Sequence, residues 1–315
     1  MAAYRDGLPQ LRDGLFVTDG GLETTLVFDE GIDLPAFAAF VLLEDEQGTQ
    51  TLRRYFEPYA ALAAKHGLGL VLESPTWRAN PDWGTELGYT GEALDELNRK
   101  AITLLEHVRA AHGREVSRIV ISGCIGPRGD GYSPDTFMSA TEAEVYHGRQ
   151  IGVFAGTEAD LVTAITMTYA EEAVGVARAA AAAGIPSAIS FTLETDGCLP
   201  SGQTLAEAIE QVDTDAGTAP AYYMINCAHP THFDRVLRDQ DPLFSRIRGL
   251  RVNASRMSHA ELDESDTLDD GDPAELGAEC AALAAYLPTL NVLGGCCGTN
   301  HRHVTEIVDA RLAAA

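Results

Sequence analysis

The chain has 315 residues, of which 45% are hydrophobic and 22% are charged, with a formal net charge of −25 at pH 7. This composition is typical of a folded globular protein and excludes disordered and collagen-like chains. The acidic excess repels phosphate backbones and anionic lipid, so we expect neither nucleic acid nor a membrane as a partner. The length fits two domains or one α/β barrel.

The chain carries no sequence pattern for membrane insertion or secretion. No apolar run approaches the roughly 18 residues that a membrane-spanning helix needs, and residues 1–14 lack the apolar core of a signal peptide. We therefore expect a cytoplasmic protein. Six cysteines are too few for a disulfide scaffold at this length, and two of them are adjacent, where a disulfide is sterically awkward, so we expect reduced thiols.

Short apolar runs alternate with Ala-rich amphipathic stretches, the pattern of parallel strands joined by helices. Strands are predicted over 15–18, 68–72, 118–122, 161–165, 187–192, 221–225, 249–252 and 291–293. Helices are predicted over 51–66, 92–111, 142–156, 170–183, 204–211, 232–239, 273–286 and 301–313. No Pro/Gly/Ser-rich linker interrupts this order, so we predict one domain over residues 1–315, a single (β/α)₈ TIM barrel of the α/β class.

A doubly wound sheet would show the same alternation of strands and helices. The segment that follows its first strand should then carry a GxGxxG fingerprint, and residues 19–23 (DGGLE) do not match it.

Two segments are longer than a minimal barrel needs. Residues 29–48 extend the first loop, and residues 261–275 form a dense acidic loop, which we interpret as solvated surface without a function.

The reactive groups of a barrel enzyme lie at the carboxyl ends of its strands. Cys227 follows the sixth predicted strand, and Cys296 and Cys297 follow the eighth, only one strand away around the rim. Glycines beside the cysteine pair let the backbone leave extended geometry, so both side chains can face one point. Three thiolates leave a fourth tetrahedral position of a zinc ion open, which is the arrangement of a catalytic site.

Other cysteines and histidines fit structural roles better. A lone cysteine is most often a small buried hydrophobe, and this interpretation is kept for Cys124, Cys198 and Cys280. His229, His301 and His303 are close enough in sequence to act as substitute ligands. Their alternative interpretation is one loop histidine and two residues of a first helical turn.

The set of segments at strand ends, DGGLETTL, GCIGPRGD, INCAHP and GGCCGT, resembles the homocysteine S-methyltransferase family from about Leu11 to Leu312. The resemblance implies a (β/α)₈ barrel and a zinc ion (Zn²⁺) held by Cys227, Cys296 and Cys297, which are then the catalytic residues through that metal. It also implies methyl transfer to the thiol of homocysteine, giving methionine. The methyl donor is expected to be an onium compound: S-methylmethionine, S-adenosylmethionine or a betaine.

The chemistry of thiols agrees with that expectation. A free thiol has a pKa near 8.5 and is mostly protonated at neutral pH, whereas a zinc-bound thiol is deprotonated and keeps a nucleophilic lone pair. Attack on the onium methyl would be an in-line displacement over about 3 to 3.5 Å. The expected partners are thus a small-molecule thiol acceptor and an onium donor, and the sequence is compatible with either a monomer or an oligomer.

Substrate-binding candidates lie in the same strand-end segments. Asp19 is expected to hold the acceptor's ammonium group and the amides of Gly20 and Gly21 its carboxylate, although the three residues also suit a simple Asx turn. Trp77 is expected to contact the onium group through a cation–π interaction, or else to pack under a loop. Asn226, beside Cys227, is a further candidate.

The chain departs from the family at the end of the fourth strand. The family's glutamate in a motif resembling ETIP, which binds the substrate amino group, is replaced in residues 165–169 (ITMTY), where Ile165 takes its place. Glu73 and Glu194 are the carboxylates expected to replace it, unless they are surface or arginine-paired groups. The departure bears on which thiol is the acceptor more than on the reaction.

Three alternatives follow from the same residues. The first is a methyltransferase for a different thiol. The second is a barrel whose zinc is structural, closed by a histidine, with a non-enzymatic interaction role. The third is another barrel enzyme, such as a lyase that acts through a carboxylate, with reduced cysteines and no metal.

Overall fold

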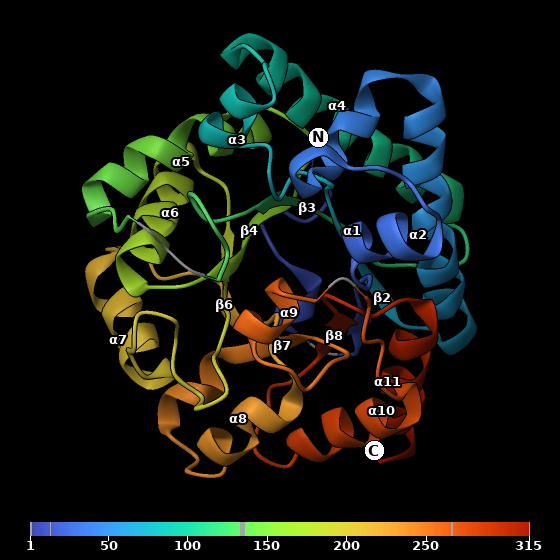
Figure 1. Cartoon of the computed structure of the whole chain (residues 1–315), viewed down its shortest axis with the longest axis vertical. Helices are drawn as coiled ribbons and strands as arrows, with labels where there is room; N and C mark the ends of the chain where they lie inside the picture. The colour runs from blue at the N-terminus through green and yellow to red at the C-terminus, as the bar shows by residue number, and fades with distance from the viewer. Residues whose placement is uncertain (1, 13, 133–135, 266, 315) are drawn as a thin grey trace.

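The computed structural model describes residues 2–12, 14–132, 136–265 and 267–314. Its strands form a closed barrel in which each strand is parallel to the next and β8 returns to β1, with helices around the outside (Figure 1). The predicted (β/α)₈ barrel of the α/β class is therefore confirmed. The strands are β1 (Phe16–Val17), β2 (Gly69–Glu73), β3 (Ile119–Ile125), β4 (Leu161–Met167), β5 (Ser187–Phe191), β6 (Tyr222–Asn226), β7 (Ile247–Val252) and β8 (Val292–Gly295).

Each predicted helix overlaps one of the long helices of the outer ring. These are α2 (Glu46–His66), α4 (Gly91–His112), α5 (Ala140–Ala155), α6 (Ala170–Ala183), α7 (Leu205–Asp215), α8 (Pro230–Leu237), α10 (Pro273–Leu283) and α11 (His301–Ala313). Three short helices were not predicted: α1 (Leu22–Thr24), α3 (Pro81–Glu86) and α9 (His259–Asp263). Residues 29–48, expected as a loop, include two 3₁₀ turns (Pro35–Phe37 and Ala39–Glu44) and the first turn of α2.

Burial explains why the strands are apolar without alternation. Every residue of β2 to β6 is buried, because one face of each strand points into the barrel and the other packs under the helices. Side chains set the helix ends: Ser139 and Glu142 form a capping box at the start of α5, and Asp45 accepts a hydrogen bond from Gly48 N at 2.7 Å to begin α2.

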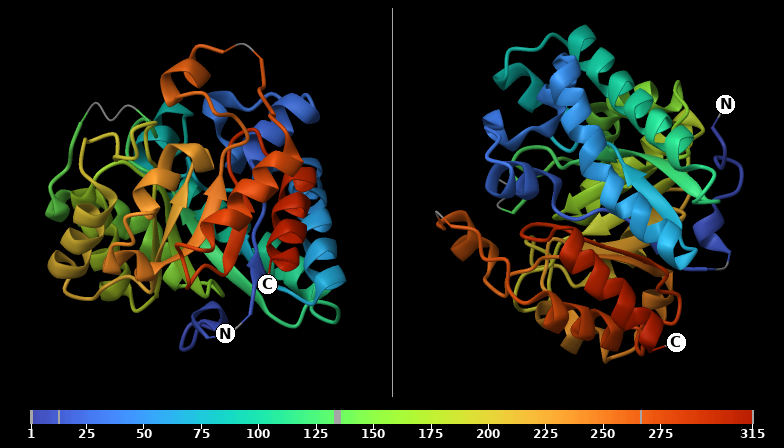
Figure 2. Two further views of the ribbon diagram at one scale, coloured as in Figure 1. Left: turned by 90° about the horizontal axis from the view of Figure 1, so that it is seen from below. Right: turned by 90° about the vertical axis from the view of Figure 1, so that its right-hand side faces the viewer.

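The two ends of the barrel differ. At the amino ends of the strands, an apolar cluster that includes Leu8, Phe16 and Tyr222 fills the interior. The chain's N-terminal segment lies across this end, whereas α9 and the residues just before α10 lie over the opposite end (Figure 2). The carboxyl ends of the strands are therefore the open end, where a barrel enzyme places its site. No helix in the described part of the chain is long and apolar enough to cross a membrane.

Candidate active site

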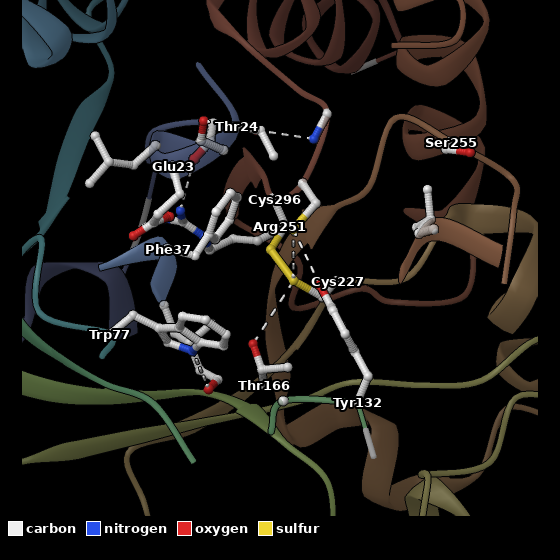
Figure 3. Close-up of a pocket in the computed structure, with 18 of the residues that line it drawn as sticks. Glu23, Thr24, Phe37, Trp77, Tyr132, Thr166, Cys227, Arg251, Ser255 and Cys296 are labelled. Carbon is white, nitrogen blue, oxygen red and sulfur yellow. Dashed lines mark hydrogen bonds between the residues drawn. A yellow bond between two sulfur atoms is a disulfide. The ribbon is translucent and has the colours of Figure 1, made fainter. Parts of the chain in front are cut away.

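A cavity of about 410 Å³ lies at the carboxyl ends of the strands. Its wall comes from the loops that follow most of the strands, together with the segment after α9 (Figure 3). The charged lining residues are Asp19, Glu23, Glu73, Asp130, Asp263 and Asp269, with Arg78 and Arg251 as the cations. The lining is thus strongly acidic, which favours a cationic ligand over an anionic one.

The three predicted cysteines lie together on this cavity. The sulfur atoms of Cys227, Cys296 and Cys297 are all within 4.8 Å of one another, and they form the one group of three metal-ligating side chains in the described residues. They converge because the amides of Cys227 and Cys296 both donate to β7, to the carbonyl oxygens of Arg251 (3.0 Å) and Val252 (2.7 Å). The expected separation by one strand is confirmed.

Two of the three sulfurs are bonded to each other. Cys227 and Cys296 form a disulfide, while Cys297 is a free thiol whose sulfur is 4.0 Å from that of Cys227. The expectation that all thiols are reduced is therefore wrong for this pair. The bond does not join the adjacent cysteines, where it was judged awkward, but cysteines 69 residues apart that the barrel brings together.

Positive φ angles and a tight contact between backbone segments set the course of the backbone near the cysteines. Gly298 has a φ of +77°, which turns the chain after the cysteine pair, and Cys227 itself has a φ of +51°. Gly21 packs so tightly that a Cβ there would collide with the carbonyl oxygen of Cys296. Gly294 and Gly295 lie within β8, so among the glycines expected to let the backbone leave extended geometry only Gly298 has a positive φ.

The other cysteines and the histidines lie outside the group of three cysteines. Cys280 is buried on α10, and Cys124 is buried at the cavity wall; Cys198, expected to be buried, is only half-buried. His229 caps α8 through a hydrogen bond from Thr231 N, and His303 contacts the carbonyl oxygen of Asp270 at 2.7 Å. None of the three candidate histidines belongs to the cysteine group of the described chain.

Asp19 is occupied by partners from the protein itself. Its carboxylate forms a 2.5 Å ion pair with Arg251 and accepts hydrogen bonds from the hydroxyls of Thr18 (2.8 Å) and Tyr55 (3.1 Å). Arg251 also donates to Thr18 Oγ1 and to Gly20 O. Burial disfavours the charged guanidinium, but the carboxylates of Asp19 and Glu73 hold the pKa of Arg251 above its ordinary value.

Glu73, which is buried, and Glu23, which is half-buried, are cavity carboxylates that form no ion pair with another described residue. Glu73 ends β2, is 5% exposed, and its Oε2 has no hydrogen-bond partner among those residues. Burial raises its pKa to about 7, against the opposing effects of Arg251 and the Ser122 hydroxyl. Burial also raises the pKa of Glu23 to about 7. A ligand cation would restore the charged form of either group.

Ile165 lines the cavity where the family's glutamate was expected. The next residue, Thr166, has a φ of +67°. Two hydrogen bonds join it to Asn226: Thr166 N donates to Asn226 Oδ1 at 2.9 Å, and Asn226 Nδ2 donates to Thr166 Oγ1 at 2.9 Å. Asn226 does not line the cavity; its Nδ2 is 3.9 Å from Cys296 Sγ. Its contacts are those of a residue that orients Thr166 and the cysteines.

The loop after β2 contributes Trp77 and Arg78 to the wall. Trp77 Nε1 donates to Ile165 O at 3.3 Å, and the guanidinium of Arg78 stacks on the indole, 4.6 Å from its centroid. The predicted cation–π contact of Trp77 is thus made in part by the protein's own arginine. The cavity side of the ring lies near Thr166 (Figure 3).

Glu194 and Gly21 are not placed as free binding groups. Glu194 lies outside the cavity lining and accepts from His259 Nδ1 at 2.9 Å. His259 in turn contacts Cys227 O at 2.6 Å and stacks on Tyr132, whose hydroxyl lies 3.2 Å from Cys297 Sγ. Gly20 and Gly21 do line the cavity, but the amide of Gly21 already donates to Thr299 O at 2.9 Å.

The interpretation of residues 261–275 as solvated surface holds for most of their acidic side chains, which are exposed, but it is incomplete. Leu262, Asp263, Leu268 and Asp269 from this segment line the cavity. Asp269 is fixed there by a 2.5 Å hydrogen bond from Ser255 Oγ. Part of the acidic segment therefore covers the open end of the barrel and adds negative charge to the cavity.

Comparison with known proteins decides the family. The family model described as homocysteine S-methyltransferase matches residues 16–311. The chain belongs to the homocysteine S-methyltransferase family. It is thus a methyltransferase enzyme, and the predicted resemblance is confirmed. No curated protein sequence matches the chain significantly.

Solved structures of one bacterial enzyme share the fold of this family member. The homocysteine methyltransferase MmuM from Escherichia coli, in its oxidized form, is 19% identical with a TM-score of 0.75, covering 95% of this chain and 96% of that chain. The metallated form is 18% identical with a TM-score of 0.73, and the apo form is 17% identical with a TM-score of 0.67; each covers 96% of this chain and 97% of that chain.

Sequence reasoning assigns no role to several cavity residues of this homocysteine S-methyltransferase family member. Glu23 lies inside the DGGLETTL segment, Arg78 directly follows Trp77, and Tyr132 lies two residues beyond GCIGPRGD. Arg251 was overlooked, although an arginine at the end of an apolar strand is a detectable pattern, because a charge there must find a partner.

Proposed function

We propose that this chain is a zinc-dependent S-methyltransferase that transfers a methyl group from an onium donor to the thiol of homocysteine, giving methionine. The observation that carries the proposal is the convergence of Cys227, Cys296 and Cys297 on an acidic cavity, in a member of this family. The proposed partners are small molecules, and the proposed location is the cytoplasm.

The donor set fits a zinc ion. Tetrahedral zinc with Zn–S distances of about 2.3 Å separates its sulfur ligands by about 3.8 Å. The sulfurs of Cys227 and Cys297 are 4.0 Å apart, and the Cys227–Cys296 disulfide must be reduced before these sulfurs can bind a metal. Zinc held there would lower the pKa of a coordinated acceptor thiol and leave its sulfur a nucleophilic lone pair.

The protein's residues would bind and orient the two substrates. Glu73 is proposed to take the acceptor's ammonium group in place of the carboxylate missing at Ile165, because Asp19 is already paired with Arg251. The acidic wall and the indole of Trp77 would attract the onium group. In the transfer, a sulfur–carbon bond forms as the carbon–onium bond breaks, its electron pair leaves with the donor, and the thiol proton passes to solvent.

A methyl-transfer assay tests this function. Reduced, zinc-loaded protein is incubated with homocysteine and, in turn, S-methylmethionine, S-adenosylmethionine and glycine betaine, and methionine is quantified. We expect methionine from at least one donor, and none from an acceptor in which a hydroxyl replaces the thiol. Methylation of other thiols but not of homocysteine would instead support a different acceptor. No transfer to any thiol would reject the proposal.

A further inference from the structure

Arg78 is a cation on the cavity wall without an anionic partner among the described residues. It is half-buried, and its guanidinium stacks between two indoles, 4.6 Å from the centroid of Trp77 and 3.7 Å from that of Trp83. Its Nε and Nη1 are buried and have no hydrogen-bond partner in the described part of the chain. The stacking fixes the fork in place but leaves its donors unused.

An arginine without an anionic partner among the described residues is unusual in a chain with 47 acidic and only 22 basic residues. Arg251, on the same cavity, pairs with Asp19 and donates to Thr18 and Gly20, so only its Nε lacks a partner among the described residues. Burial lowers the pKa of Arg78, whereas the fields of Asp130 and Glu23 raise it without forming an ion pair in the described structure. Unused buried donors cost folding free energy, so a guanidinium kept in this way indicates a ligand that completes it.

The ligand that fits is not a simple anion. Six carboxylates line the cavity against two arginines, so a free anion would be repelled. A zwitterion avoids this repulsion, because its cationic part can lie against the acidic wall while its carboxylate meets Arg78. The cation receptor is adjacent: Trp77 precedes Arg78 in the chain, and Gly131 packs so near the Trp77 ring that its Cβ would be 3.0 Å away, which holds the indole in place.

We propose that Arg78 binds the carboxylate of the methyl donor. The inference rests on the proposed function and assigns one residue to recognition of the donor. Glu73, the proposed partner of the acceptor's ammonium group, lies at the end of β2. Arg78 stacks on Trp83 of α3, so Arg78 and Trp77 lie closer to the rim of the barrel than Glu73 does. A donor anchored at Arg78 then places its onium group beside Trp77, on the side of Thr166 and the cysteines (Figure 3).

Paired donors that differ only at the carboxylate test the proposal. Glycine betaine is compared with choline, and dimethylsulfoniopropionate with (3-hydroxypropyl)dimethylsulfonium, by calorimetry without an acceptor and by donor kcat/KM with saturating homocysteine. The proteins are the wild type, Arg78→Gln and Arg78→Lys. Arg128→Gln is the matched control, because Arg128 lies outside the cavity lining and is paired with Asp82 at 2.8 Å.

We expect the wild type to favour the carboxylate-bearing member of at least one pair by tenfold or more, the effect of one charged hydrogen bond. Arg78→Gln should abolish this preference, Arg78→Lys should keep part of it, and Arg128→Gln should keep all of it. Equal affinity for both members in the wild type, absence of onium binding, or an unchanged preference in Arg78→Gln would overturn the inference. If Arg78→Gln does not fold, the wild-type pairs and Arg78→Lys decide.

The binding measurement separates this inference from the proposed function. A carboxylate preference that depends on Arg78, without methyl transfer to any thiol, would leave the inference standing and reject the function. Methyl transfer from donors without a carboxylate, at the same efficiency as from the matched donors that carry one, would leave the proposed function standing and reject the inference.

Discussion

The two ends of the barrel use the same residue type in opposite ways. At the amino end, Arg5 donates four hydrogen bonds of 2.7 to 3.2 Å to the carbonyl oxygens of Ala155, Thr157 and Ala159, and so ties the N-terminal segment to the loop before β4. At the carboxyl end, the guanidinium of Arg78 has no hydrogen bond among the described residues. The arginine at the amino end thus stabilises the fold through saturated donors, whereas the arginine on the cavity wall keeps two buried donors unused.

The carboxylates at the two ends differ in their hydrogen bonds and not in the direction of the pKa shift, because burial raises the pKa of Asp160 as well. Asp160, near the amino end, accepts hydrogen bonds from Tyr4 N at 2.7 Å and Ile121 N at 2.9 Å and pairs with Arg109. Glu73 and Glu23, in the cavity, have pKa values raised to about 7 by burial. A buried carboxyl with a raised pKa lowers the free energy of unfolding at neutral pH, so Glu73 and Glu23 reduce the stability of the fold.

The cysteine cluster should give the largest effect at the open end. Cys227→Ser, Cys296→Ser and Cys297→Ser should each reduce methyl transfer to background and bound zinc to well below one ion per chain, since each removes a thiolate ligand. The melting temperature of the reduced proteins should change little, because the barrel core does not depend on the cluster.

Activity, elemental analysis and circular dichroism on the same samples check this prediction. Cys198→Ser is the control, because Cys198 lies outside the cavity lining, and it should retain both zinc and activity. Full zinc retention in all three ligand variants would contradict the assignment. Loss of the fold together with zinc would indicate a structural metal.

Glu73→Gln should give the next largest effect. Removing the carboxylate leaves the acceptor's ammonium group unpaired, which costs about 1.5 to 3 kcal/mol, so kcat/KM for homocysteine should fall at least tenfold. The same variant should change kcat/KM much less for 4-mercaptobutyrate, which lacks the amino group. Steady-state kinetics with both thiols measure the difference. Glu194→Gln, outside the cavity lining, should leave the ratio between the two thiols unchanged.

The stability of Glu73→Gln should depend on pH. The pKa of Glu73 is about 7 in the folded protein against an ordinary value of 4.5, so its contribution to stability is present at low pH and is lost as pH rises through 7. The amide does not ionise, and the variant should exceed the wild type by about 3 kcal/mol at pH 8 and by less than about 1 kcal/mol at pH 5. Urea unfolding at both pH values measures this; an advantage that is equal at both would contradict it.

Arg5→Ala should have the smallest effect on catalysis. Loss of the hydrogen bonds to Ala155, Thr157 and Ala159 should lower the free energy of unfolding by about 1 to 3 kcal/mol, while kcat/KM stays unchanged. Thermal melts and kinetics on one preparation decide. A large loss of activity in correctly folded Arg5→Ala would show that the two ends of the barrel are coupled, and the contrast drawn between them would fail.

Much of this arrangement follows from local patterns. Apolar runs such as residues 161–165 and Ala-rich stretches such as 170–183 predict their strand and helix, and strand-end positions predict that Cys227 meets Cys296 and Cys297. What the patterns do not contain is the pairing of side chains across the barrel. Asp19 looks free until Arg251, 232 residues away, is seen to neutralise it. The cavity-lining part of residues 261–275 is likewise set by tertiary packing.

The central claim is that three cysteines hold a metal whose fourth position receives the acceptor thiol. Zinc X-ray absorption on the reduced, zinc-loaded protein tests it most directly, with and without homocysteine. We predict three sulfur neighbours at about 2.3 Å plus one light-atom ligand, changing to four sulfur neighbours when homocysteine is added. A site closed by four protein ligands, with a spectrum that homocysteine does not alter, would contradict the account.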